Sequence, residues 1–275
     1  MKLEVSAPTD PQPSWVFDMA VLPSCNLLIA DHGNDSLKVV DVQTGRLLSH
    51  LHLPGRPYNL CLLPGDRAAV SLLRERVIQI VDISSDQLKL LESVKVAVKC
   101  IGLAYLNNKF IVGLPPSLPF ILSDQQCVAY LNTEETLLKS VTKDNMENQL
   151  FKDPSHICVT TDIDGLSIYV SDRGTHTITR LSEKLEVLQT FRFPTMDGPY
   201  DLTAAGGGQL LVRGCYGGFT TLWVLNTGTG EFRELLGYKW EVWYTACVEF
   251  CPRLGRVYTN IGKHGENSYI RVYGI

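Results

Sequence analysis

The chain has 275 residues, of which 45% are hydrophobic and 20% are charged, with a net charge of -4 and a pI near 5.9. This balance excludes wholesale disorder, and the acidic character argues against a general affinity for nucleic-acid backbones or anionic membranes. No run approaches the roughly 18 apolar residues of a membrane-spanning helix, and the start "MKLEVSAPTDPQPSW" lacks the apolar core of a signal peptide, so we expect a soluble, cytoplasmic protein.

In chain order, the sequence predicts one short strand at residues 2–7 ("KLEVSA") and then a repeat. Each copy alternates apolar and polar residues in successive strands joined by Gly, Asn or Asp turns, with little helical periodicity. The copies begin near residues 15, 57, 100, 155, 199 and 243, a spacing close to that of a four-stranded propeller blade.

Six such copies predict a single all-β domain over residues 1–275, a six-bladed β-propeller with four antiparallel strands in each blade. The sixth copy offers three strands, so we expect residues 2–7 to pair beside "YIRVYG" as its fourth strand and close the ring. The third copy is longer and contains "TKDNMENQLFKDPSH", which we interpret as a solvated connection, the alternative being a binding lid.

The eight cysteines are scattered through apolar segments, which predicts buried reduced thiols rather than a disulfide framework. Only Cys247 and Cys251 stand close together, and without a second pair they do not suggest zinc.

The segment "LLIADHGNDSLKVVD" carries an acid at the end of a strand, and "IYVSDRGTHTITRL" repeats it. We expect Asp31 and Asp172 to accept hydrogen bonds from the backbone N–H groups of the following turns, with Gly33 and Asn34 supplying left-handed backbone angles.

With these residues in view, the chain resembles the NHL-repeat propeller at the C-terminus of tripartite-motif ubiquitin ligases. The strand-ending Asp31 with Gly33 and Asn34 matches the repeat, as does "GPYDLTAAGGGQLLV". The resemblance implies a non-catalytic domain that recognises substrates within the ubiquitin pathway. The ligase's RING, B-box and coiled-coil segments are not in this sequence, so by itself the propeller would not transfer ubiquitin.

A loop face is the predicted partner site, because arginine and aromatic residues on rigid loops have the composition of interaction hot spots. Its candidates lie in the turns between second and third strands and in the connections between blades: His32, Arg56, Tyr58, Arg74, Arg76, Arg173, His176, Tyr216, Trp243, Lys263 and His264. We predict a protein partner for a monomeric domain. RNA is the second alternative, and acidic neighbours such as Glu75 and Asp172 oppose it.

The opening strands suggest a different alternative. They place Asp18, Asn59, Ile101, His156, Asp201 and Thr245 at equivalent positions, which a propeller would turn toward its channel. Four of them, Asp18, Asn59, His156 and Asp201, could bind calcium, in a pattern similar to the six-bladed calcium-dependent lactonases. The lactonases' inner glutamate is missing here, so we expect no cofactor and no enzymatic activity, with the metal-dependent hydrolase as the rival hypothesis.

Overall fold

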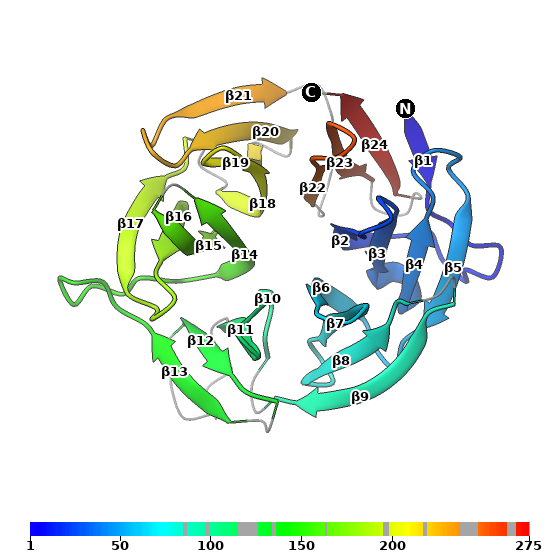
Figure 1. Cartoon of the computed structure of the whole chain (residues 1–275), viewed down its shortest axis with the longest axis horizontal. Coiled ribbons are helices and arrows are strands. Elements are labelled where there is room, and N and C mark those ends of the chain that lie inside the picture. Colours follow the sequence, from blue (N-terminus) through cyan, green and yellow to red (C-terminus); the bar gives the residue numbers. More distant parts are fainter. Residues whose placement is uncertain are drawn as a thin grey trace. The chain divides into compact units, whose positions relative to one another are not determined.

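The computed structural model describes residues 1–84, 87–96, 99–114, 126–133, 136–162, 164–194, 198–216, 219–236, 247–262 and 268–274. These residues form six four-stranded antiparallel sheets and one short 3-10 helix, His32–Asn34 (Figure 1). The chain is therefore all-β, and its fold class is the six-bladed propeller predicted from the repeat.

Two compact units divide the chain, and the first comprises Met1–Val94 with Trp240–Ile275. It holds three blades. The first blade contains β2 (Val16–Val21), β3 (Leu27–Asp31), β4 (Ser36–Val40) and β5 (Leu47–His52). The second contains β6 (Pro57–Leu63), β7 (Arg67–Leu72), β8 (Val77–Asp82) and β9 (Lys89–Lys95), and the last contains β22 (Val248–Cys251), β23 (Arg256–Ile261), β24 (Tyr269–Gly274) and β1 (Lys2–Glu4).

The second unit, Lys95–Lys239, holds the other three blades. The third blade contains β10 (Leu103–Leu106), β11 (Lys109–Leu114), β12 (Cys127–Leu131) and β13 (Leu137–Val141). The fourth contains β14 (Pro154–Asp162), β15 (Gly165–Asp172), β16 (Thr177–Leu181) and β17 (Val187–Arg192), and the fifth contains β18 (Pro199–Gly206), β19 (Gln209–Tyr216), β20 (Phe219–Asn226) and β21 (Phe232–Leu236).

The burial of each strand follows its place in the blade. The middle strands β3 and β4 are buried at every residue, because neighbouring sheets cover both of their faces. The outer strand β5 alternates between half-buried and exposed residues, as expected for a strand with one face in water. Between the first two blades the core contains Leu28, Leu37, Leu60, Val70 and Val81.

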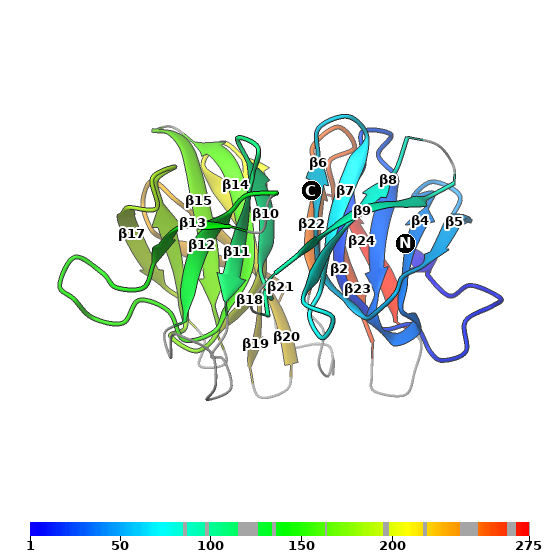
Figure 2. The same ribbon diagram turned by 90° about the horizontal axis from the view of Figure 1, so that it is seen from below.

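The N-terminal strand completes the last blade, as predicted. Lys2 lies opposite Arg271 and Leu3 opposite Ile270, in antiparallel register, and the buried side chain of Leu3 fills the core there. The strand ends at Glu4, earlier than expected, and the chain then runs along the outside of the first blade beside β4 and β5 (Figure 2). Asp10 anchors this connection through an ion pair with Lys38.

The long polar segment of the third copy forms a turn and no helix among its described residues. Asp144 accepts hydrogen bonds from the backbone N–H groups of Met146 and Asn148, and the Met146 side chain is exposed. This exposed Asx-type turn agrees with a solvated connection.

Candidate functional site

The strand-ending aspartates hold the turns that follow them, as the sequence predicts, and also the connection that enters each blade. Asp31 accepts hydrogen bonds from the backbone N–H groups of Gly33 at 3.1 Å and of Trp15 at 2.8 Å. Asp172 does the same with Thr175 at 2.8 Å and with Lys152 at 2.7 Å. Each carboxylate therefore fixes two loops on one face of its own unit.

The prediction that Gly33 and Asn34 supply left-handed backbone angles is wrong. Glycine is required at position 33 for a different physical reason. The left-handed residues are Asp35 (φ 48°) in the first blade and His176 (φ 59°) in the fourth, whereas Gly33 and Asn34 have ordinary angles. A Cβ on Gly33 would lie 2.7 Å from the carbonyl oxygen of Pro13. Glycine is needed because the incoming connection passes close to the turn.

A buried cation, which the sequence analysis missed, stabilises Asp31. Lys38 Nζ lies 2.6 Å from a carboxylate oxygen of Asp31 and 2.6 Å from one of Asp10, and the Lys38 side chain is fully buried. Burial raises the pKa of Asp31, but the positive charge of Lys38 and the hydrogen bonds from Asn34, Lys38 and Trp15 outweigh it, so the net pKa is lowered. Lysine within an otherwise apolar middle strand is the signal that could have indicated this cluster.

Four rings form an aromatic cluster on the loop face of the first unit: Trp15, Phe17, His32 and Tyr58. The His32 ring stacks on Phe17 with centroids 4.1 Å apart, and Trp15 and Tyr58 contact it edge-on at 5.2 Å and 5.0 Å. His32 is buried beneath the other three, which are half-buried. The predicted candidate His32 therefore supports the surface from below.

Hydrogen bonding and burial fix the His32 ring. Its Nδ1 lies 3.0 Å from the carbonyl oxygen of Pro57, at the start of β6. Burial lowers the pKa of His32, although the contact with Pro57 acts in the opposite direction. A neutral, anchored imidazole gives the cluster a rigid base.

Arginines lie near this aromatic cluster, and the charges of Arg56 and Arg74 act on His32 in addition to its burial. Arg56 is half-buried with its Nε 3.7 Å from Asp35 Oδ1, and Arg74 and Arg76 lie in the turn after β7, where both are exposed. Gly55 and Glu75 are in close approach, because a Cβ on Gly55 would collide with the Glu75 carboxylate. The connection before β6 and the turn after β7 thus form one continuous loop surface.

In the second unit the candidates Arg173 and His176 lie on the turn after β15. Arg173 Nη2 lies 2.7 Å from Asp153 Oδ2, and its guanidinium stands 5.2 Å from the centre of the Tyr200 ring. His176 is half-buried beside Gly198. Trp243, Lys263 and His264, like Thr245 of the opening-strand set, lie outside the described residues, as does the side chain of Tyr216.

A β-bulge at the start of four opening strands explains why aromatic and polar residues stand together there. The register shifts between Val16 and Asp18, between Pro57 and Leu60, between Pro154 and His156, and between Pro199 and Asp201. In three of these bulges an aromatic residue precedes the polar one: Phe17, Tyr58 and Tyr200. Recurring bulges of this kind re-aim side chains and often lie beside functional sites. The repeated aromatic–polar pair was the available signal for Phe17 and Tyr200, which the sequence analysis did not select.

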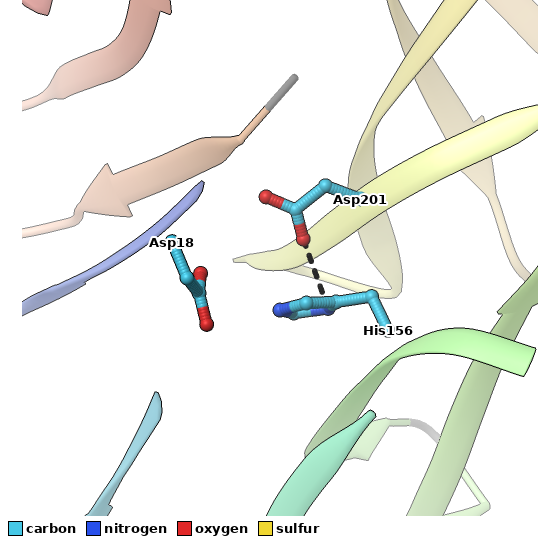
Figure 3. Close-up of side chains that lie close together, drawn as sticks. All are labelled: Asp18, His156 and Asp201. Carbon is cyan, nitrogen blue, oxygen red and sulfur yellow. Dashed lines mark ion pairs between the residues drawn. The ribbon is translucent and has the colours of Figure 1, made fainter. Parts of the chain in front are cut away.

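The opening-strand polar residues occupy both units. In the second unit, His156 Nδ1 lies 2.9 Å from Asp201 Oδ1, and Figure 3 shows the second ring nitrogen on the side away from Asp201. Asp201 is buried and also accepts a hydrogen bond from the backbone N–H of Leu202. Opposite Asp201 in the sheet stands the fully buried Arg213.

In the first unit, Asp18 and Asn59 are buried. Asp18 accepts hydrogen bonds from the backbone N–H groups of Met19 and Leu60, both at 2.8 Å, which joins β2 to β6. Asn59 donates its backbone N–H to Ser71 Oγ at 3.0 Å. Ile101, the apolar member of the set, lies before β10 and is half-buried.

No protein-family model matches the sequence, and a search of curated proteins finds no match. Solved structures resemble the fold. The chain is 16% identical to a luciferin-regenerating enzyme, covering 100% of this chain and 96% of that one with a TM-score of 0.68. A catalytically inactive histidine-to-alanine variant of virginiamycin B lyase from Staphylococcus aureus with quinupristin is 13% identical, covering 100% and 88% with a TM-score of 0.65.

A WD40-repeat structure resembles the chain to a similar degree. The WD40 repeats of RRP9 are 13% identical, covering 99% of this chain and 96% of that one with a TM-score of 0.63. The six four-stranded sheets and the similarity to these solved structures together define the chain as a six-bladed β-propeller. This class contains both enzymes and interaction domains. Among the described residues, no helix is long and apolar enough to cross a membrane.

Proposed function

We propose that this propeller is a non-catalytic recognition module that binds a protein partner through the loop face of its first unit. The observation that carries the proposal is the aromatic cluster of Trp15, Phe17, His32 and Tyr58, flanked by Arg56 and Arg74. Half-buried rings beside arginines on fixed loops have the composition of a binding hot spot.

The loop face of the first unit would need little conformational ordering to bind a partner. Asp31 holds the turn and the incoming connection, and the bulges fix Phe17 and Tyr58 at strand ends. A preformed surface loses little conformational entropy when a partner binds. We expect the partner to present an apolar side chain to the rings and a carboxylate to Arg74.

The finer proposal is that the module resembles the substrate-recognition end of a tripartite-motif ubiquitin ligase. Support comes from the repeated acid at Asp31 and Asp172, which fixes a turn and the incoming connection in both blades. The seven described cysteines are free thiols, which fits the cytoplasm as the place of action.

The test compares capture of partners from cell extract by the wild-type chain and by two face variants, Tyr58→Ala and Arg74→Ala. Matched controls in the same unit are Tyr273→Ala, a half-buried tyrosine on β24, and Arg46→Ala, an exposed arginine in the turn before β5. We expect both face variants to lower the affinity for a purified partner at least about tenfold, or about 1.4 kcal/mol. Equal binding by all five proteins would refute the proposed face, and capture that disappears with ribonuclease would point to RNA.

The His156–Asp201 pair favours one rival function, a hydrolase or lyase centred on the second unit. A carboxylate beside Nδ1 orients a histidine ring in the way that general-base catalysis requires. In the similar virginiamycin B lyase, a histidine-to-alanine variant is catalytically inactive. Turnover of lactone or ester substrates that is lost in both His156→Ala and Asp201→Ala, but kept in Tyr58→Ala, would establish this rival.

A further inference from the structure

Two cysteines that are 226 positions apart meet at neighbouring hairpin turns of the first unit. Cys25 occupies the turn between β2 and β3, and Cys251 ends β22 just before the turn to β23. Their sulfur atoms lie 3.4 Å apart within the core cluster shared by the first and last blades. Both thiols are buried, so neither lies freely at the surface.

An arginine covers the pair. Arg253 Nε lies 2.9 Å from the Cys25 sulfur, and Arg253 Nη2 donates a 2.6 Å hydrogen bond to the carbonyl oxygen of Pro23. The second bond holds the guanidinium across the two turns, while the side chain remains exposed to solvent. A cation beside one sulfur and a second thiol beside that sulfur are the two features of a redox-active cysteine pair.

The two sulfurs differ in acidity. For Cys25, burial raises the pKa, but hydrogen bonds from Arg253 and Cys251 outweigh it and the net pKa is lowered. For Cys251, burial and the neighbouring Cys25 both raise the pKa. Cys25 is therefore the nucleophile, and Cys251 is the thiol that resolves its oxidised form.

The geometry points to a reversible redox site, in which Cys25 and Cys251 form a disulfide that joins the first and last blades when the protein meets a hydroperoxide. The Cys25 thiolate attacks one peroxide oxygen, so that an S–O bond forms and the O–O bond breaks. The departing alkoxide or hydroxide takes up the proton that the Cys25 thiol released and leaves as alcohol or water. Cys251 then attacks the Cys25 sulfur; the S–S bond forms, the S–O bond breaks, and the proton of Cys251 leaves with the hydroxyl as water. A dithiol reductant returns Cys25 and Cys251 to thiols by thiol–disulfide exchange and is itself oxidised to a disulfide.

The test treats the reduced, full-length chain with an equimolar amount of hydrogen peroxide and maps its peptides without reduction. We expect a Cys25–Cys251 peptide pair to form before any other cysteine is modified, and dithiothreitol to remove it. The disulfide closes a very long loop, so we expect the oxidised protein to melt about 5 °C or more above the reduced protein. A first modification elsewhere, including a disulfide through the nearby Cys247, would overturn the assignment.

Variants separate the roles of the residues. Arg253→Gln should slow disulfide formation at pH 7 at least about tenfold, because the thiolate loses its cation. Cys127→Ser is the matched control, since burial raises the pKa of that isolated thiol to about 11 and it should not affect the rate. An unchanged rate in Arg253→Gln would contradict the role of the arginine, and the wild-type peptide map remains decisive if a variant does not fold.

Discussion

At the scale of single residues, the loop face depends on buried charge beneath it. Lys38 is fully buried between Asp10 and Asp31, and Asp31 in turn holds the turn that carries His32. Removing one member of a buried ion pair leaves an uncompensated charge. We therefore expect Lys38→Ala to lower the free energy of unfolding by about 3–5 kcal/mol in urea denaturation.

The control for this variant is Lys2→Ala, because Lys2 forms an exposed pair with Glu4 and its removal should leave stability nearly unchanged. The folded-state pKa of Asp31 is lower than its pKa in the unfolded chain. The contribution of Asp31 to the free energy of unfolding is therefore fully present above about pH 4 and is lost as the pH falls through the folded-state pKa. Equal effects of the two lysine variants would contradict the role of the buried cluster.

His32 gives a second residue-scale prediction, this time near neutral pH. Burial lowers its folded-state pKa, so the unfolded chain binds the proton first, and stability is lost as the pH falls below about 6.5. The free energy of unfolding should therefore change more between about pH 7.5 and about pH 5.5 for the wild-type chain than for His32→Gln. Burial also lowers the pKa of His50. Because His50 is present in both proteins, its contribution to the pH dependence cancels in the comparison. An identical pH dependence would show that the imidazole is not held neutral.

At the scale of elements, the short strand β1 has a structural role out of proportion to its length. It covers the edge of β24, and Leu3 is 1% exposed against the core of the first unit. We expect Leu3→Ala to destabilise the protein by about 2–4 kcal/mol, and Glu4→Ala, on the exposed face of the same strand, to leave stability nearly unchanged. A neutral Leu3→Ala would mean that closure by β1 contributes little.

The repeat made the blades predictable, because strand alternation and turn residues are local properties of the sequence. Asp31 and Asp172 could be placed at their turns for the same reason. The Phe17–His32 stack, the Lys38 cluster and the Cys25–Cys251 contact could not, because each depends on residues brought together from different strands or blades. Gly33 shows most clearly what the local sequence cannot predict. Glycine is required at position 33 because the carbonyl oxygen of Pro13, which lies well before it in the chain, passes close to it.

At the scale of the whole molecule, the six-bladed fold alone does not choose between catalysis and recognition, because one propeller fold can carry many unrelated functions and the similar structures include both enzymes and a WD40 propeller. What favours recognition is that hydrogen bonds hold the backbone of Trp15, the turn that carries His32 and the His32 ring itself in place. The His156–Asp201 pair provides the competing chemistry in the second unit.

Hydrogen exchange of the chain with and without its purified partner tests the recognition proposal most directly. Amides in residues 13–17, 32–35, 54–58 and 73–76 should exchange more slowly in the complex, because these segments make up the loop face. Slower exchange confined to the strands around His156 and Asp201, with the loop face unchanged, would contradict the recognition proposal.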